Sequence, residues 1–212
     1  MKLLALETSS GLLSIAGFED GSLKLELSRD ALMRQNENLA PLVAELLNTL
    51  NWKASELGAL AVSLGPGSFT GLRTGLAFAK GLSYANGAIL IGISTLEAWA
   101  EGEDEAEVWL DARRGFVYRA AYKKGILIKE AQMLPMEEAR RELSPGMKLL
   151  GDLQDLKGLP SAAKLGRLAW ERVKRGERDD PASLEPSYLR RAEAEILWEK
   201  RQEKSAGGTG AS

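Results

Sequence analysis

The stretch that decides the fold is Leu64-Gly65-Pro66-Gly67-Ser68-Phe69-Thr70-Gly71-Leu72-Arg73-Thr74-Gly75. The apolar run over residues 57–64 before it predicts a buried strand, and the run over residues 71–85 after it predicts a helix. Proline fixes φ and glycine reaches backbone angles that other residues avoid, so the Gly-Pro-Gly segment predicts a tight turn. Ser68 or Thr70 is expected to cap the helix by accepting from its first free N–H groups.

The predicted helix is apolar around most of its circumference. Between residues 71 and 85 only Arg73 and Lys80 are charged. One face can pack on the chain's own sheet, and the other needs a second cover. Gly71 and Gly75 lie four residues apart on one side, where they would let a neighbouring backbone come close. The cover is either another part of this chain or a second protein, and the pattern leaves both open.

The turn carries only a weak signal for a cofactor. A strand, a glycine turn and a helix can present N–H groups to an anion, but this stretch lacks the Gly-Lys-Ser/Thr ending of a P-loop. The glycines at 65, 67 and 71 miss the dinucleotide-binding spacing by one residue, and no acid follows at residues 91–94.

Composition excludes several kinds of chemistry. The 212 residues contain neither cysteine nor histidine. This absence excludes disulfides, thiolate chemistry, the usual zinc sites and imidazole acid–base catalysis, and we expect no metal site. The net charge of −2 gives no strong attraction to nucleic-acid phosphates. Because no stretch is long and apolar enough to span a bilayer and no signal peptide is recognisable, we expect a cytoplasmic protein without membrane contact.

The second half of the chain repeats the first half. Residues 107–125 align with residues 3–21 without gaps, at a fixed offset of 104 residues. The matched pairs are Leu6 and Leu110, Glu7 and Asp111, Gly11 and Gly115, Ala16 and Ala120, Phe18 and Tyr122, and Gly21 and Gly125. We infer two copies of one strand–turn–strand–turn–strand unit.

Other patterns complete the predicted organisation. Apolar spacing over residues 39–50 predicts an amphipathic helix, and residues 88–93 predict a strand. After the second copy we expect a short strand at 148–151, a helix over 161–175 and a charged helix over 191–204. The resulting domains are an N-terminal lobe over 1–100, a smaller C-terminal lobe over 101–204 that ends in the last helix, and a disordered tail over 205–212.

Two α/β units that each open with a strand, an acid and a small loop are the layout of the actin-like and sugar-kinase ATPase superfold, here with a reduced second lobe. In that superfold the two first loops face each other and hold phosphates and Mg²⁺, so Glu7 and Asp111 would face each other. The alternative, which we favour, is that both acids are vestiges that make turn hydrogen bonds. Thr8 and Ser9 offer no glycine for close phosphate approach, and Arg113 stands where such a loop would carry a small residue.

Five segments carry a resemblance that extends over nearly the whole chain. They are residues 3–9, the Gly-Pro-Gly-Ser-Phe-Thr-Gly-Leu-Arg motif at 65–73, and residues 92–98, 111–118 and 188–190. In this order they resemble the TsaB (YeaZ) family of bacterial subunits for tRNA threonylcarbamoyladenosine (t6A) biosynthesis. The resemblance implies a two-lobed actin-like fold and a non-catalytic subunit. Its partners would be TsaD, a larger paralogue that carries the metal and the active site, and TsaE, a P-loop ATPase.

The resemblance also implies where the partners bind. In that family the first two long helices form the TsaD interface, and the isolated subunit pairs with itself through the same face. The chain alone is expected to bind no cofactor. ATP, ADP and Mg²⁺ would bind only at an interface in the complex, and tRNA would bind only through the complex. The interface positions carried onto this sequence are Leu39, Leu42, Val43, Leu46, Gly71, Leu72, Arg73, Gly75, Phe78 and Ala79.

Two other hypotheses stand beside the interaction subunit. An ATPase or kinase would use Glu7 and Asp111 to hold Mg²⁺, and calorimetry with Mg-ATP on the wild-type protein and Glu7→Ala would distinguish it. The other hypothesis is a metalloprotease, which the glycoprotease-like relatives of the family suggest. Because this chain contains neither histidine nor cysteine, it has no ordinary set of zinc ligands, which argues against this hypothesis.

Overall fold

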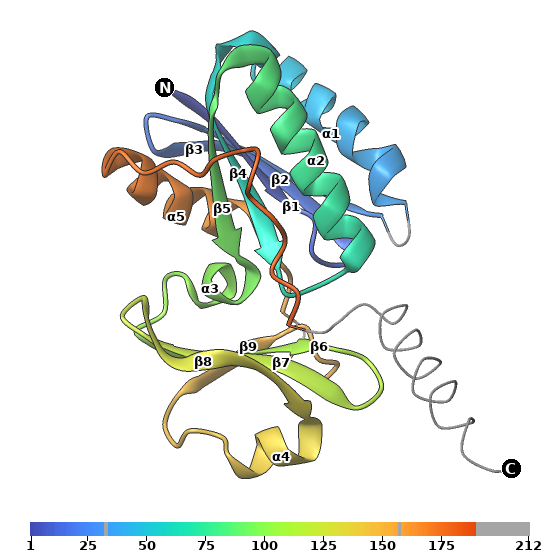
Figure 1. Ribbon diagram of the computed structural model, residues 1–212, viewed down its shortest axis with the longest axis vertical. Coiled ribbons are helices and arrows are strands. Elements are labelled where there is room, and N and C mark those ends of the chain that lie inside the picture. Colours follow the sequence, from blue (N-terminus) through green and yellow to red (C-terminus); the bar gives the residue numbers. More distant parts are fainter. Residues whose placement is uncertain (32–33, 157, 190–212) are drawn as a thin grey trace, which may run out of the picture.

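The computed structural model describes residues 1–31, 34–156 and 158–189, which form two β-sheets with helices around them (Figure 1). The first sheet comprises β1 (Lys2–Glu7), β2 (Leu12–Glu19), β3 (Ser22–Asp30), β4 (Leu57–Gly65) and β5 (Ile89–Ser94). The second comprises β6 (Glu105–Asp111), β7 (Phe116–Lys123), β8 (Ile126–Pro135) and β9 (Lys148–Gly151). The helices are α1 (Gln35–Thr49), α2 (Phe69–Asn86), α3 (Thr95–Ala100), α4 (Met136–Arg141) and α5 (Ala162–Lys174), with a 3-10 turn at Ala54–Glu56.

The first sheet is the larger one, with strand order β3-β2-β1-β4-β5. Strands β1, β2 and β3 pair antiparallel, whereas β1, β4 and β5 pair parallel. Strand β4, which lies between β1 and β5 in the sheet, is buried along most of its length, as expected for a parallel strand covered on both faces. Helices α1 and α2 lie side by side over one face, and α5 covers the other (Figure 1).

The position of α5 corrects the predicted domain boundary. Its residues Ala162, Leu165 and Ala169 pack against Leu3 and Phe18 of the first sheet. Residues 101–204 therefore do not form one lobe, because the chain returns to the first lobe after β9. The short helix α3 packs between the two sheets (Figure 1). The helix predicted over 191–204 and the tail predicted over 205–212 lie outside the described residues.

The second sheet confirms the repeat inferred from the sequence. Its order β8-β7-β6-β9 matches β3-β2-β1-β4 of the first sheet, and the described residues contain no counterpart of β5 in it. Strands β2 and β7 begin at Leu12 and Phe116, which are 104 residues apart. The turns that follow them, at residues 20–21 and 124–125, both have positive φ. The fold is thus a duplicated mixed sheet whose second copy is reduced.

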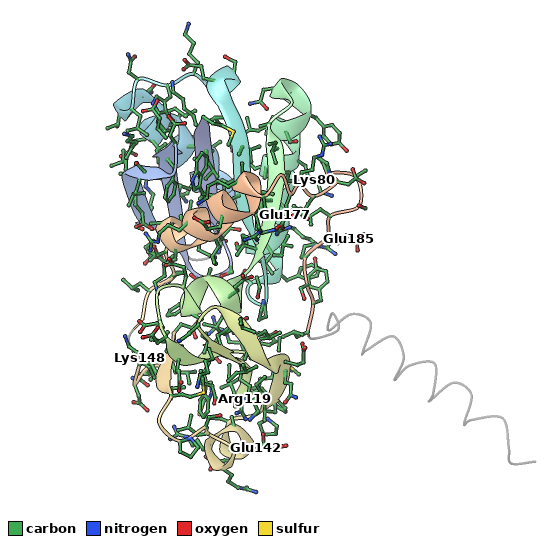
Figure 2. The ribbon with its side chains drawn as sticks, turned by 90° about the vertical axis from the view of Figure 1, so that its left-hand side faces the viewer. Lys80, Arg119, Glu142, Lys148, Glu177 and Glu185 are labelled. Carbon is green, nitrogen blue, oxygen red and sulfur yellow. The ribbon has the colours of Figure 1, made fainter. Side chains whose placement is uncertain are left out.

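The second lobe contains a fully buried ion pair. Arg119 Nη2 lies 2.6 Å from Glu107 Oε1, and both side chains are 0% exposed. Arg119 Nη1 also donates to Glu142 Oε2 at 3.0 Å (Figure 2). The second Glu107 oxygen accepts from Ser144 N at 3.2 Å. Buried charges need partners of this kind because each has lost its water.

Substitution of Arg119 should destabilise the second lobe strongly. Arg119→Met would leave Glu107 buried without its counter-charge, and the expected loss in the free energy of unfolding is roughly 3–5 kcal/mol. Urea denaturation measures it. The control is Lys123→Met at the end of β7, the strand that carries Arg119; it removes the exposed pair with Glu105 of β6 and should change stability little. Equal effects of the two substitutions would contradict this account.

Candidate protein-binding site on helix α2

The turn between β1 and β2 packs against the glycines of the β4–α2 motif. A Cβ atom on Gly67 would lie less than 3.0 Å from Ser9 O, and one on Gly71 would lie less than 3.0 Å from Thr8 O. A Cβ on Gly75 would meet Thr8 Oγ1 equally closely. Real Cβ atoms do not approach other atoms so closely, so these positions require glycine if the turn is to keep its place.

Hydrogen bonds hold the same two segments together. Ser68 N donates to Ser9 O at 2.6 Å, and Thr8 N donates to Ser63 Oγ on β4 at 3.2 Å. Ser68 Oγ accepts from Gly71 N at 3.2 Å, which confirms Ser68 as the predicted cap of the helix. The start of α2 is therefore fixed by the turn that follows β1.

Glu7 faces the interior. Its side chain is 1% exposed, and Oε1 accepts from Ser9 N at 2.7 Å. Burial raises the pKa of Glu7, although hydrogen bonds from Ser9 and Ser63 act in the opposite direction. Burial thus disfavours the charged form of this carboxyl group, and its side chain is not exposed to a ligand.

Asp111 makes the same turn contact in the second lobe. Arg113 N donates to Asp111 Oδ1 at 2.7 Å, two residues along the chain, as Ser9 N does to Glu7. Asp111 N donates to Asp152 Oδ1 at 2.7 Å, and burial raises the pKa of Asp152. No hydrogen bond or ion pair joins Glu7 to Asp111 in the described part of the chain. Both acids thus make the turn hydrogen bonds of the interpretation that we favoured.

The first turn does not fit the phosphates of a Mg-nucleotide. The N–H groups of Thr8 and Ser9 are already donated to Ser63 and Glu7, and Gly67 and Gly71 pack against the carbonyl groups of the turn. Across residues 1–31, 34–156 and 158–189 no group of three or more acidic side chains could hold a metal ion. We derive no catalytic step from these residues.

Most of the predicted interface positions lie in the core of the first lobe. Phe78 is half-buried against the same core, and only Arg73 is exposed. The interpretation of the other positions as a free docking face is wrong, because α1 and α2 lie together on one face of the sheet and the Thr8–Ser9 turn covers the two glycines. The buried positions are Leu39, Leu42, Val43, Leu46, Leu72 and Ala79, together with Gly71 and Gly75.

Helix α2 nevertheless has one narrow face in contact with water. Phe69 is 41% exposed and Tyr84 is 69% exposed, and a Cβ on Gly81 would meet nothing within 4 Å. The exposed positions recur every three or four residues, so they form one stripe along the helix. We call this surface the α2 stripe, and its residues are Phe69, Thr70, Arg73, Ala77, Gly81, Tyr84 and Ala85.

Aromatic rings surround Arg73 at the start of the α2 stripe. The Arg73 guanidinium carbon lies 3.9 Å from the centre of the Phe69 ring, and Arg73 Nε donates to Tyr188 Oη at 3.0 Å. The Phe69 and Tyr188 ring centres are 5.2 Å apart. No local sequence pattern predicts this cluster, because Tyr188 is remote from Arg73 in the chain. Tyr188 does lie in residues 188–190, the last of the five segments that carry the family resemblance.

Tyr188 reaches α2 on a C-terminal strap, residues 177–189, which runs along β5 and α2 (Figure 1). Asp179 N donates to Leu90 O at 2.9 Å, and Asp179 Oδ2 accepts from Gly92 N at 2.7 Å. At the other end Ser187 N donates to Leu64 O at 2.7 Å. Figure 2 shows that Lys80 and Glu177 are on this side of the first lobe. The strap thus fixes Tyr188 beside the beginning of the helix.

Comparisons with known proteins agree with this architecture. The model of a family described as TsaD, tRNA N6-adenosine threonylcarbamoyltransferase, matches residues 29–139. The tRNA threonylcarbamoyladenosine biosynthesis protein TsaB of Bacillus subtilis strain 168 is 30% identical over 232 aligned positions, which cover 95% of this chain and 100% of that protein. The chain belongs to the TsaB family.

Two further relatives have either a lower coverage or a lower identity than the Bacillus subtilis protein. The TsaB protein of Escherichia coli K12 is 32% identical over 130 residues, which cover 58% of this chain and 56% of that protein. The solved structure of YeaZ from Pseudomonas aeruginosa superposes with a TM-score of 0.77 at 26% identity and covers 89% of this chain and 99% of that one. The predicted two-lobed α/β fold, a duplicated mixed sheet with a reduced second copy, is confirmed. No helix of the described residues could span a membrane.

The packing of the Thr8–Ser9 turn predicts opposite effects for two glycines of α2. Gly71→Ala forces a methyl group against the Thr8 carbonyl and should cost roughly 1–3 kcal/mol of unfolding free energy. Gly81→Ala meets open space and should stabilise the helix by up to about 1 kcal/mol. Thermal and urea unfolding measure both. A tolerated Gly71→Ala would contradict the proposed packing.

Burial of Glu7 predicts a pH-dependent gain for Glu7→Gln. The pKa of Glu7 is raised above 4.5 in the folded protein, so stability is lost in the wild type as pH rises from 4.5 through the folded pKa. Glu7→Gln lacks this loss, and its stability relative to wild type should increase over the same range. Glu56→Gln is the control: the pKa of Glu56 is lowered from 4.5 by hydrogen bonds from Lys53 and Lys2, so the stability of this variant relative to wild type should decrease as pH rises from the folded pKa to 4.5 and stay level above it. Parallel pH profiles would contradict this prediction.

Proposed function

We propose that this chain is a non-catalytic subunit of the machinery that makes t6A at adenosine 37 of tRNA, and that it binds the catalytic subunit TsaD through the α2 stripe. The observation that carries the proposal is the composition of this stripe. It combines two exposed aromatic residues, Phe69 and Tyr84, with the small residues Ala77 and Gly81. Aromatic residues are enriched at interfaces, and small residues let a partner helix come close.

The proposed role is supporting rather than catalytic. The sequence lacks histidine and cysteine, and Glu7, the acid at the end of β1, is buried inside its own lobe. Metal, nucleotide and acyl transfer would then belong to TsaD, with TsaE as the third component. ATP, ADP and Mg²⁺ would bind only at an interface in the complex. The free chain would pair with itself through the α2 stripe, contact tRNA only through the complex, and act in the cytoplasm.

Reconstitution with single omissions tests the role. The cognate TsaD and TsaE with ATP, threonine-derived adenylate and tRNA should form t6A, measured by mass spectrometry of digested tRNA. Leaving out this chain should reduce the product strongly, and this chain alone should form none. Full modification without this chain would reject the proposal.

A substitution on the open side of α2 tests the proposed face in a binding assay. Gly81→Trp fills the centre of the α2 stripe, where the structure has open space, and should weaken TsaD binding at least about tenfold by calorimetry. Lys174→Trp on α5, which is also exposed, is the control and should bind normally. Gly71→Leu and Gly75→Leu are unsuitable, because they would disturb the fold before they reach a partner. Normal binding by Gly81→Trp would exclude this face.

A further inference from the structure

Arg73 has one bound edge and one free edge. Its Nε donates to Tyr188 Oη, whereas its terminal nitrogens Nη1 and Nη2 have no hydrogen-bond or ion-pair partner among the described residues. A guanidinium carries five N–H donors in a planar fork. Its free edge therefore fits a carboxylate through two parallel hydrogen bonds.

The rings hold this free edge in a fixed direction. The guanidinium stacks on Phe69 and is 5.9 Å from the centre of the Tyr188 ring. An exposed arginine usually loses rotamer freedom when it binds a partner, but here most of that loss has already occurred on folding. Arginine and tyrosine are also the residue types that contribute most at protein interfaces. The cluster is thus preorganised for binding, although Phe69 and Tyr188 remain 41% and 42% exposed.

Charge indicates which partner would meet Arg73. Helix α2 contains no aspartate or glutamate. Its other cation, Lys80, lies close enough to Asp180 of the strap to help lower the pKa of that acid, whereas no aspartate or glutamate of the described residues forms an ion pair with Arg73. A second copy docked through the same helix would place Arg73 against another acid-free helix. A nucleic-acid backbone requires several cations in a row, and Arg73 is instead followed along the stripe by Ala77 and Gly81.

We propose that Arg73 receives a carboxylate from an acidic side chain on a helix of the partner protein, and that Phe69 and Tyr188 position Arg73 for this contact. The inference rests on the proposed function, in which the partner is TsaD. It adds the chemistry of recognition: a helix that packs on Ala77 and Gly81 and carries an aspartate or glutamate at the level of Arg73.

A zero-length cross-link identifies the carboxylate. Arg73→Lys retains the charge and supplies an amine, which a water-soluble carbodiimide joins to a contacting carboxyl group with loss of water. The variant is mixed with cognate TsaD and compared with wild type by mass spectrometry of the digested complex. We expect one additional link, from the introduced lysine to an aspartate or glutamate of TsaD.

Other products of the same reaction would overturn the inference. A link to Glu193, Glu195, Glu199 or Glu203 in the same chain would assign the free edge of Arg73 to the chain's own C-terminal segment. A link to an isotope-labelled second copy would assign it to self-association. The absence of any additional link would also reject the contact.

Affinity provides an independent readout. Arg73→Ala should weaken TsaD binding roughly tenfold to a hundredfold by calorimetry. Tyr188→Phe keeps the ring but removes the hydroxyl that accepts from Arg73, and should cause a smaller loss. Arg140→Ala, at an exposed arginine of α4 in the second lobe, is the control and should bind normally.

The outcomes separate this inference from the proposed function. If wild type binds TsaD and Arg73→Ala binds equally well, with an unchanged Tm, the role of Arg73 is wrong and the proposed function stands. If wild type does not bind TsaD, both fail. Loss of binding in Arg140→Ala as well would show that the effect is not specific to Arg73 and would also reject the contact.

Discussion

The close approach of two backbones, at the Thr8–Ser9 turn and the start of α2, is the constraint on which the rest of the structure depends. It requires the absence of side chains at Gly67, Gly71 and Gly75. Because the turn lies against these positions, it fixes where α2 begins and how the helix is rotated on the sheet. That rotation decides which residues face the core and which form the α2 stripe. The same contact occupies the backbone groups that would otherwise be available to a phosphate.

The duplication explains why the two halves of the chain carry an acid at the same place. Each copy begins with a strand and an acid that accepts from the backbone N–H two residues later. In the first copy that acid, Glu7, is buried, and in the second it is followed by Arg113 and Arg114 in a left-handed turn. In the part of the chain that the structure describes, the second copy also lacks a fifth strand, and α5 returns to cover the first sheet. The acids therefore contribute to the folding of each hairpin, which is a local structural role.

Local patterns predicted the elements better than their surroundings. The apolar spacing of α1, the strand before Gly65 and the offset between the two copies depend on neighbours in sequence, and the structure confirms them. The faces of α2 could not be predicted in the same way. The spacing of Gly71 and Gly75 indicates close approach of a backbone, but it does not say whether that backbone is Thr8 of the same chain or part of another protein. Likewise, the apolar spacing of α5 predicts an amphipathic helix but does not say which sheet that helix covers. The contact of Arg73 with Tyr188 joins two residues that no local pattern relates.

The C-terminal strap affects how the protein behaves in concentrated solution, because it covers an edge strand. Strand β5 is at the edge of the first sheet, and an uncovered edge strand is a template for pairing with strands of other molecules. Here Leu90 O accepts from Asp179 N, Gly92 N donates to the Asp179 carboxylate, and Gly92 O accepts from Arg172. The strap and the last turn of α5 thus occupy the backbone hydrogen-bonding groups in the middle of β5. A few polar contacts near the end of the sequence thereby protect the sheet from intermolecular strand addition and aggregation.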